Sequence, residues 1–556
     1  MNKNSNKKLW ANQFNSKNKK FMYYFIWNLI LFFWILIIGF CFWTLILLQW
    51  ENTEETLEPT IVKIFVCLNF VFNIILYCDS TKQFIYGLYY NFSVKKDLLK
   101  EKLEWNKKYQ KSNINNANYL VYVLYCTCDD FDENSLLKSM NQKYKNCKFF
   151  LLDDSKTDSY KKKVDEFSKK YKIEVIRREN KKGYKAGNIN HFLKNDKKYD
   201  YFVILDADEI IPSDFIGKSL LYFMEDSQIG IVQAKNLCNR QKNLFDYVGS
   251  YIHNFQWQVE HNVRNRIGIN NLYGHGAIIK KECYEAANGF PEVVSEDWAL
   301  TYKALQNNFI VVYANNIVCY EEFPSEYISF KKRQYRWSQG TVEVFKLFGL
   351  KTLFNNKIPF FRRIDTSINL TFFIVTTSST LLILFNLMIL CPLGFSFTFS
   401  DWYVVITLFF AIAPLINCFF FYLGKINFFK LLLIILFFYF IYSSLLVSTI
   451  FAIVSSFVKS KLKFFVTPKN KTNNSFSFWK AILLNIYEII VAFILITVLI
   501  LICCLTNVNI MSFGWIILII IPMFLSVIYS LISNLKISQK NKINMINDYK
   551  NPYLFV

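Results

Sequence analysis

The sequence predicts an α/β domain with a mixed sheet, inserted into a polytopic bundle of membrane-spanning α-helices. The chain of 556 residues is 53% hydrophobic, and its apolar residues form runs long enough to cross a bilayer. Between those runs, residues 110–325 alternate short apolar segments with polar helical ones, which is typical of a sheet covered by helices. The formal charge of +22 fits lysine-rich loops on the cytoplasmic side of a membrane.

Charge and cysteine usage exclude other classes of protein. A strongly basic chain also suggests nucleic acid as a partner, but here the lysines cluster beside the apolar runs, so membrane lipids are the expected partner and nucleic acid is not. The 13 cysteines include no CxxC pair. Their spacing therefore predicts neither a zinc site nor a disulfide framework, and reduced thiols are expected.

The first segments predict a cytoplasmic tail at residues 1–20 and two transmembrane helices within 21–95. The first apolar run is too long for a signal-peptide core, so we expect it to stay in the membrane. The loop at 51–59 carries glutamates and no lysine, whereas lysines accumulate from Lys95 onward. The positive-inside rule then places the α/β domain in the cytosol.

After the domain, residues 326–362 predict interfacial amphipathic helices, and residues 367–556 predict a second membrane region. Its apolar runs are 370–390, 402–422, 431–458, 481–505 and 513–532. Five crossings would put the lysines of 459–471 outside the cell. Four crossings, with 431–458 interfacial or re-entrant, keep every lysine-rich segment inside. We therefore predict six crossings in a multi-pass plasma-membrane protein with both termini cytoplasmic.

The apolar run 201–205 ends in Asp206 and Asp208. Ligands of open α/β sheets bind at the carboxyl ends of the strands, and two carboxylates one residue apart suit a hard divalent cation that also holds phosphate. An acidic turn after a strand is the alternative for any isolated pair of this kind.

Further predicted strands at 119–125 and 148–152 also precede acids, with Asp153 and Asp154 directly after the second. The remaining predicted strands are 173–176, 230–233 and 309–313. Several carboxylates on one sheet edge favour a site over scattered loop acids. Lys185 lies in a glycine-containing segment and offers a positive charge for phosphate, with a solvated lysine turn as the alternative.

Six motifs carry a resemblance to a known family. They are DDS at 153–155, KAGN at 185–188, DAD at 206–208, SED at 295–297, RQYRW at 333–337 and FFVTPK at 464–469. In this order they resemble the membrane-embedded, processive family 2 glycosyltransferases, which include cellulose and hyaluronan synthases. The resemblance implies a cytosolic GT-A domain with a Rossmann-like sheet.

The resemblance also implies roles for the acids. Asp153, with Asp154 beside it, would contact the uridine, and Lys185 would contact the diphosphate. Asp206 and Asp208 would hold the nucleotide through Mg²⁺ or Mn²⁺. Asp297, next to Glu296, would be the general base, which agrees with the need for one carboxylate to accept the acceptor's proton. The alternative for SED is a helix N-terminus with Ser295 as its cap.

Gly274 and His275 lie where the resemblance implies an acceptor site, and a structural turn is the alternative. Arg333, Arg336 and Trp337 offer guanidinium groups for diphosphate and an indole face for a sugar. Here RQYRW departs from the QRxRW of cellulose synthases, and a basic amphipathic helix is the alternative.

The segment 459–480 would be a gating loop over the nucleotide, with Thr467 and Lys469 as phosphate partners. A basic cytoplasmic loop is the alternative reading of its composition.

Together these features predict an inverting, processive transferase that polymerises a sugar from a UDP-sugar, best UDP-glucose, onto a growing polysaccharide and exports the chain through its own helices. UDP-galactose as donor and transfer of single sugars to a membrane lipid are alternatives within the same class. A catalytically dead scaffold or transporter is the alternative from another class.

Overall fold

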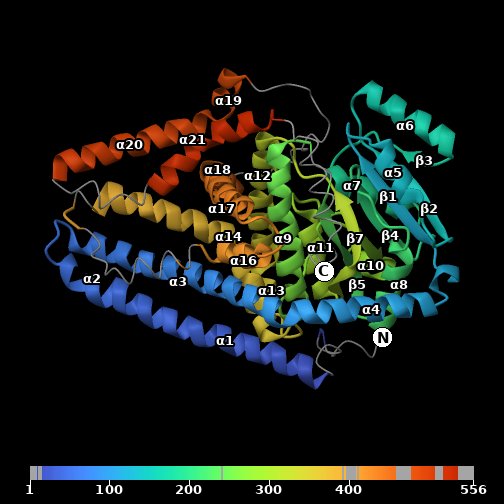
Figure 1. The fold of residues 1–556 in the computed structure, drawn as a ribbon, viewed down its shortest axis with the longest axis horizontal. Helices are drawn as coiled ribbons and strands as arrows, with labels where there is room; N and C mark the ends of the chain where they lie inside the picture. Colours follow the sequence, from blue (N-terminus) through green and yellow to red (C-terminus); the bar gives the residue numbers. More distant parts are fainter. Residues whose placement is uncertain are drawn as a thin grey trace.

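The structure is a computed structural model that describes residues 9–10, 16–239, 242–390, 393–395, 409, 412–458, 477–506 and 517–535. The sheet domain occupies one end of the molecule and long apolar helices occupy the other (Figure 1). Thr467, Lys469 and most of the predicted gating loop lie outside the described residues, so those predictions stay predictions.

The sheet has seven strands in the order β3-β2-β1-β4-β6-β5-β7. The strands are β1 (Val121–Thr127), β2 (Cys147–Asp153), β3 (Glu174–Ile176), β4 (Tyr201–Asp206), β5 (Ile229–Cys238), β6 (Ala277–Lys280) and β7 (Ile310–Glu321). All neighbours pair in parallel except β6, which is antiparallel to β4 and β5. The predicted mixed sheet is confirmed. The sequence analysis did not predict β6.

Alternating side chains of the strands fill a core on each face of the sheet. Val123 and Val203 pack on one face, together with residues of α5, α6 and α8, while Leu124 and Ile204 pack on the other with α7 and α10. These helices are α5 (Glu133–Met140), α6 (Asp158–Tyr171), α7 (Tyr184–Asn195), α8 (Phe215–Glu225) and α10 (Lys281–Ala286). The result is a three-layer α/β domain.

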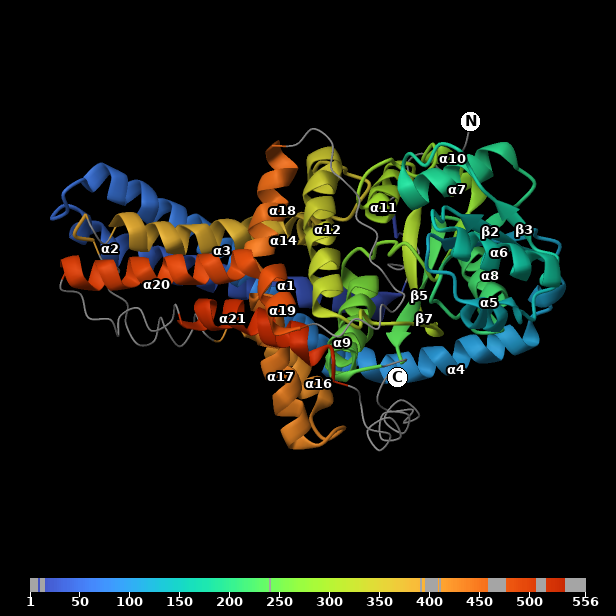
Figure 2. The same ribbon diagram turned by 90° about the horizontal axis from the view of Figure 1, so that it is seen from above.

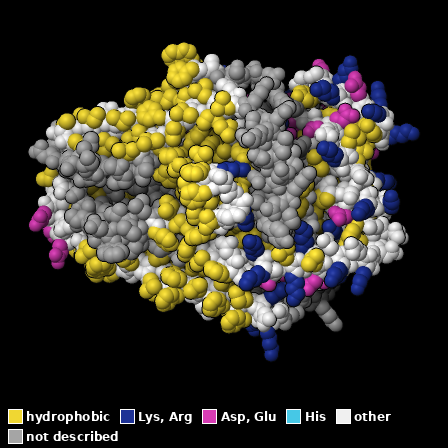
Figure 3. Space-filling view, in the orientation of Figure 1, with side chains coloured by type: hydrophobic (Ala, Val, Ile, Leu, Met, Phe, Trp, Pro, Cys, Tyr) yellow, Lys and Arg dark blue, Asp and Glu magenta, His cyan; other side chains and the backbone are white. Residues whose placement is uncertain are grey.

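The opposite end of the molecule consists of apolar helices. They are α1 (Lys17–Cys41), α2 (Leu48–Trp50), α3 (Pro59–Tyr89), α14 (Phe360–Phe385), α16 (Ala413–Tyr422), α17 (Phe428–Ser443), α18 (Leu446–Val458), α19 (Phe478–Leu484), α20 (Ile486–Thr506) and α21 (Ile517–Ile532). Hydrophobic side chains cover this end, whereas lysine and arginine gather on the sheet domain (Figure 3). This distribution is that of a membrane protein.

Length and composition single out four helical segments of the described chain as able to span a bilayer: Lys17–Thr53, Pro59–Lys111, Phe428–Val458 and Ile486–Cys504. The third contains α17 and α18, and Figure 2 shows both of them running across the direction of α1, α3 and α20. A helix perpendicular to the spanning ones is what an interfacial segment requires. The prediction of six crossings is compatible with this arrangement and stays a prediction.

Four further helices join the two ends: α4 (Lys95–Lys111), α9 (Leu244–Ile267), α12 (Tyr327–Val344) and the short α13 (Leu350–Leu353). Val259 and Val263 of α9 belong to one buried cluster with Trp27 of α1 and Phe421 of α16. The Trp27 indole N–H also donates to the carbonyl of Ile267, at 3.1 Å. Helix α9 therefore packs the sheet domain directly against the apolar bundle.

Buried charges reinforce this junction. Lys82 of α3 is fully buried, and its Nζ lies 2.9 Å from an oxygen of Asp79 and 3.2 Å from an oxygen of Asp365 on α14. The Tyr86 hydroxyl donates to Asp365, and Arg264 of α9 lies 3.6 Å from the second Asp365 oxygen. Because Asp365 contacts two buried cations, it links three helices through one carboxylate.

We predict that Asp365→Asn strongly destabilises the protein, because it leaves Lys82 and Arg264 without the charge that they share. Breaking a buried pair costs about 3–5 kcal/mol, so the melting temperature of the full-length protein in detergent should fall clearly. The control is Asp97→Asn, whose half-exposed carboxylate pairs with Arg266 at 3.0 Å and should cost less than about 1 kcal/mol. Equal melting temperatures for the two variants would contradict the role of Asp365.

Candidate active site

Strand register brings the predicted acids together. Thr127 of β1 pairs with Asp153 of β2, and Cys126 pairs with Asp206 of β4, so these strands end at one edge. A cavity of about 1230 Å³ lies against that edge. Its walls include Asp154, Asp206, Asp208, Lys185, Gly274, His275, Glu296, Asp297, Arg333, Arg336 and Trp337. Almost all the predicted site residues that the structure describes therefore face one space.

Lys185 connects three parts of this edge. It lies in the first turn of α7, and its Nζ contacts Asp206 Oδ1 at 2.5 Å and donates to the Gly274 carbonyl at 2.7 Å. Burial lowers the pKa of Lys185, but the charge of Asp206 outweighs burial and raises the pKa above its usual value. Lys185 is therefore a cation held beside the acids of β4.

Asp206 and Asp208 suit a hard divalent cation. Both are carboxylates that line the cavity at the end of β4, and Asp208 Oδ2 also accepts from the backbone N–H of Glu322 at 3.2 Å. Oxygen-only donors beside a lysine fit Mg²⁺ or Mn²⁺ carrying a diphosphate. The donor set therefore fits the predicted cation, whose identity the residues do not distinguish.

Glu209 stabilises the turn that contains Asp206 and Asp208. It was not predicted as a site residue. It is completely buried, and its Oε2 accepts from the backbone N–H groups of Gly276, at 2.9 Å, and Asp206, at 3.4 Å. Burial raises the pKa of Glu209, and the charge of His275 opposes that rise. Glu209 thereby ties the DAD turn to the glycine loop that contains His275.

Asp153 and Asp154 each pair with an arginine that the sequence did not single out. Arg177 Nε contacts Asp153 at 2.7 Å, and Arg178 binds Asp154 through two nitrogens, at 3.1 and 2.6 Å. Asp154 lines the cavity, whereas Asp153 is buried and is not among the lining residues. Arg177 and Arg178 directly follow β3. Their position at the carboxyl end of a strand is the sequence feature that could have identified them as site residues.

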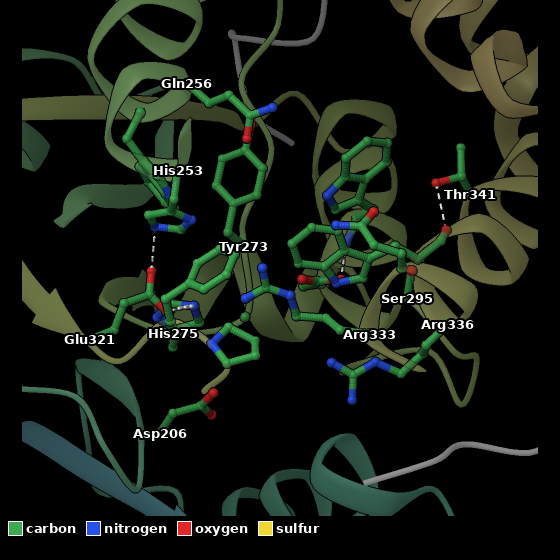
Figure 4. A pocket seen from close by; sticks show the side chains of 18 of the residues that line it. Asp206, His253, Gln256, Tyr273, His275, Ser295, Glu321, Arg333, Arg336 and Thr341 are labelled. Atoms are coloured by element: carbon green, nitrogen blue, oxygen red, sulfur yellow. Dashed lines mark hydrogen bonds and ion pairs between the residues drawn. The ribbon is translucent and has the colours of Figure 1, made fainter. Parts of the chain in front are cut away.

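His275 lies between Glu209 and Glu321, and Figure 4 shows its ring beside Glu321. Its Nδ1 is 3.3 Å from Glu209, and its Nε2 is 3.6 Å from Glu321, which in turn contacts His253 at 2.8 Å. Burial lowers the pKa of His275, but Glu321 and Glu209 raise it to about 10. Burial raises the pKa of Glu321, and the two histidines outweigh it and lower that pKa to about 2. The cavity wall therefore carries an imidazolium and a carboxylate.

Glu296 and Asp297 open α11 (Glu296–Gln306) and face the same cavity. The backbone N–H of Trp298 donates to Asp297 Oδ1 at 2.8 Å. Burial, followed by the charge of Asp297, raises the pKa of Glu296 to about 8. Burial also raises the pKa of Asp297, against the charges of Arg336 and Lys185. The N-terminal turn of the helix thus presents two buried carboxyl groups, both with a raised pKa, to the cavity.

Helix α12 holds this turn in place. A Cβ at Gly340 would lie 1.9 Å from the Ser295 hydroxyl oxygen, so only glycine allows the helix to approach so closely. Glu343 also accepts from the backbone N–H of Val294, at 2.8 Å. On the same helix the Arg333 guanidinium lies 4.7 Å from the Trp337 ring centroid, and Arg336 faces the cavity beside them (Figure 4). RQYRW and SED are therefore one packed unit.

Comparisons with known proteins agree with this geometry. Residues 133–340 match the family model described as glycosyltransferase like family 2. A probable glucomannan 4-beta-mannosyltransferase 11 from Oryza sativa subsp. japonica is 28% identical over 231 residues. That match covers 38% of this chain and 39% of the rice protein, so the chain spans well under half of the relative that it matches. Residues 133–340 are therefore similar to the domain that this family model describes.

Two solved structures are distant neighbours in fold. The mannosyltransferase PcManGT from Pyrobaculum calidifontis, solved with GDP-Man and Mn²⁺, has a TM-score of 0.39 and 16% identity, over 62% of this chain and 99% of its own. S. aureus TarS has a TM-score of 0.31 and 16% identity, over 46% of this chain and 43% of its own. Similarity this low adds no detail about ligands. The GT-A-like prediction is confirmed by the mixed sheet together with the family match.

We predict that the stability contributed by His275 depends on pH. Its pKa is about 10 in the folded protein and about 6.5 when unfolded, so the contribution is complete below pH ~6.5 and is lost as pH rises through 10. His275→Gln should lower the melting temperature more at pH 6 than at pH 10. His191→Gln, at an exposed position of α7, is the control and should change little. A deficit independent of pH would contradict the charged state of His275.

Proposed function

We propose that this protein is an inverting hexosyltransferase that adds sugars from a UDP-sugar to a growing polysaccharide at the inner membrane face and passes the product through its own helices. UDP-glucose is the preferred donor in this proposal. Mg²⁺ or Mn²⁺ at Asp206 and Asp208 would be the cofactor. The uridine would lie near Asp153 and Asp154, and Lys185 would contact the diphosphate.

The observation that carries this proposal is the continuity of the cavity. The same space that borders the sheet edge is also lined by Asp79 and Tyr86 of α3, Asn369 of α14, Asn417 of α16 and Tyr439 of α17. These polar and aromatic side chains suit sugar hydroxyls and ring faces. A chain growing at Asp297 would therefore have a path that begins among the membrane helices.

The charges of the site support one division of roles. Burial and the charge of Asp297 raise the pKa of Glu296 to about 8. The Trp298 N–H and the charges of Arg336 and Lys185 oppose the effect of burial on Asp297 and would stabilise its ionised form. Asp297 would accept the proton of the acceptor hydroxyl while that oxygen bonds to the anomeric carbon and the bond from that carbon to the diphosphate breaks. Attack from the face opposite the leaving group inverts the configuration. A bound cation would neutralise charge on the departing diphosphate.

Gly274 permits this geometry, since a Cβ there would lie 3.2 Å from Asp297 Oδ2. Its φ of +83° is also strained for other residues. His275 and Trp337 border the same space and would position the acceptor sugar, while the guanidinium of Arg333, which also lines it, would contact the diphosphate. Thr467 and Lys469 would close the site from the gating loop.

Two other activities stay open in the same class. The rice relative is named a mannosyltransferase, so a mannosyl donor is one of the candidates. The order of the motifs is the same for a glucosyl and a galactosyl donor, so UDP-galactose is another. Transfer of single sugars to a lipid is the other candidate, since the cavity reaches helices that border the membrane.

In the proposed topology the chain crosses the membrane six times. Helices α17 and α18 would lie along the inner interface, as their direction across α1 and α3 in Figure 2 supports. The catalytic domain would then face the cytosol, where nucleotide sugars occur.

The deciding experiment offers single labelled donors to the purified full-length protein in lipid vesicles with Mg²⁺ or Mn²⁺. The donors are UDP-glucose, UDP-galactose and GDP-mannose, followed by size and linkage analysis of the product. A long polymer from UDP-glucose supports the proposal. A single sugar on lipid supports the glycolipid transferase, and no nucleotide release from any donor favours the inactive scaffold.

We predict that Asp297→Asn lowers the rate of sugar transfer by about 10²- to 10⁴-fold, the usual contribution of a positioned general base. Donor affinity should stay within a few-fold of wild type, because Asp297 acts on the acceptor. The rate is measured by nucleotide release and the affinity by titration with the UDP-sugar. Glu285→Gln, an exposed carboxyl-to-amide change on α10, is the matched control. Near-normal turnover of the Asn variant would exclude Asp297 as the base.

A further inference from the structure

A second group of potential metal ligands lies beside the acids of β4. Cys238, His253 and Glu321 are buried, and their ligand atoms all lie within 4.8 Å of one another. None of them belongs to a motif of the sequence, and the cysteine spacing predicts no zinc site. The sheet brings them together, because Cys238 and Glu321 are direct partners at the last position of the β5–β7 ladder.

The backbone holds the three side chains in place. Asn254, the neighbour of His253 on α9, accepts from the backbone N–H of Cys238 at 2.8 Å and donates to the Cys238 carbonyl at 3.1 Å. This pair of bonds fixes α9 to the end of β5, as the strand pairing fixes β5 to β7. The bonds of the Asn254 side chain and the strand pairing therefore hold the three residues close together in the fold.

His253 and Glu321 form a close ion pair, with Nε2 and Oε1 2.8 Å apart. The pair places an imidazole nitrogen and a carboxylate oxygen next to each other, and both are ligand types that bind Zn²⁺. Both residues also line the cavity, which supplies an entry route and room for a water as fourth ligand.

Acidic groups lie near the thiol. Burial raises the pKa of Cys238, and the carboxylates of Glu321, Asp208 and Asp246 act in the same direction, against the guanidinium of Arg333. A divalent ion bound by the thiolate would displace the thiol proton into solvent.

We propose that Cys238, His253 and Glu321 form a zinc site that is separate from the Mg²⁺ or Mn²⁺ position at Asp206 and Asp208. One thiolate, one imidazole and one carboxylate make a borderline-soft donor set that selects Zn²⁺ over Mg²⁺ and Mn²⁺. The ion would tie β5, β7 and α9 together. The ion would also bind Glu321, which contacts His275. It would lie next to Glu322, whose backbone N–H donates to Asp208. This proposal does not depend on the sugar that the protein transfers.

The first test uses Co²⁺ as a spectroscopic probe on the full-length protein in detergent with excess Mg²⁺. We expect one Co²⁺ per chain, a sulfur-to-cobalt charge-transfer band in the near ultraviolet, and displacement of that band by one equivalent of Zn²⁺. This measurement needs no variant. Absence of the charge-transfer band would overturn the proposal, since it would leave Cys238 uncoordinated.

The second test measures Zn²⁺ affinity by competition with a chromophoric chelator. Cys238→Ser and His253→Gln should each weaken binding by at least ~10-fold, while Cys283→Ser, another buried cysteine on α10, should leave it unchanged. Binding that is equal in all four proteins would show that zinc lies elsewhere and that the cluster is an ion pair beside a protonated thiol.

Discussion

The register of β1 with β2 and β4 is the constraint on which the candidate site depends. Hydrogen bonds of the parallel ladder align Thr127 with Asp153 and Cys126 with Asp206, so the residues after three strands meet at one edge. A shift of one residue would turn Asp206 to the other face of the sheet and separate it from Lys185. The apolar side chains that fill both faces of the sheet make such a shift costly.

Around that edge, the charges are arranged in alternation. Lys185 lies beside Asp206, Arg178 beside Asp154, and His275 between Glu209 and Glu321. Each buried charge has an opposite charge in contact, which offsets the cost of removing it from water. Asp297 is held differently, by a backbone N–H and by a helix turn that α12 packs against.

Buried opposite charges in contact also stabilise the junction between the sheet domain and the apolar bundle. Helices α9 and α12 carry polar residues toward the cavity and apolar residues toward the membrane helices, and Lys82, Asp365 and Arg264 join three helices through buried ion pairs. Because the junction is built into the walls of the cavity, the catalytic edge and the entrance to the bundle form one space.

The sequence by itself predicted the class of fold and six of the seven strands, and nearly all of its predicted site residues that the structure describes line the cavity. It could do so because strand runs, the acids that follow them and short motifs are local patterns. It did not reveal β6, Glu209, Arg178, Glu321 or the grouping of Cys238 with His253. Those features depend on which distant segments pair. A pairing such as that of Cys238 with Glu321 produces no recognisable pattern in the sequence. Only the tertiary structure decided them, since hydrogen-bonded register and helix packing, and not spacing along the chain, set the distances between side chains.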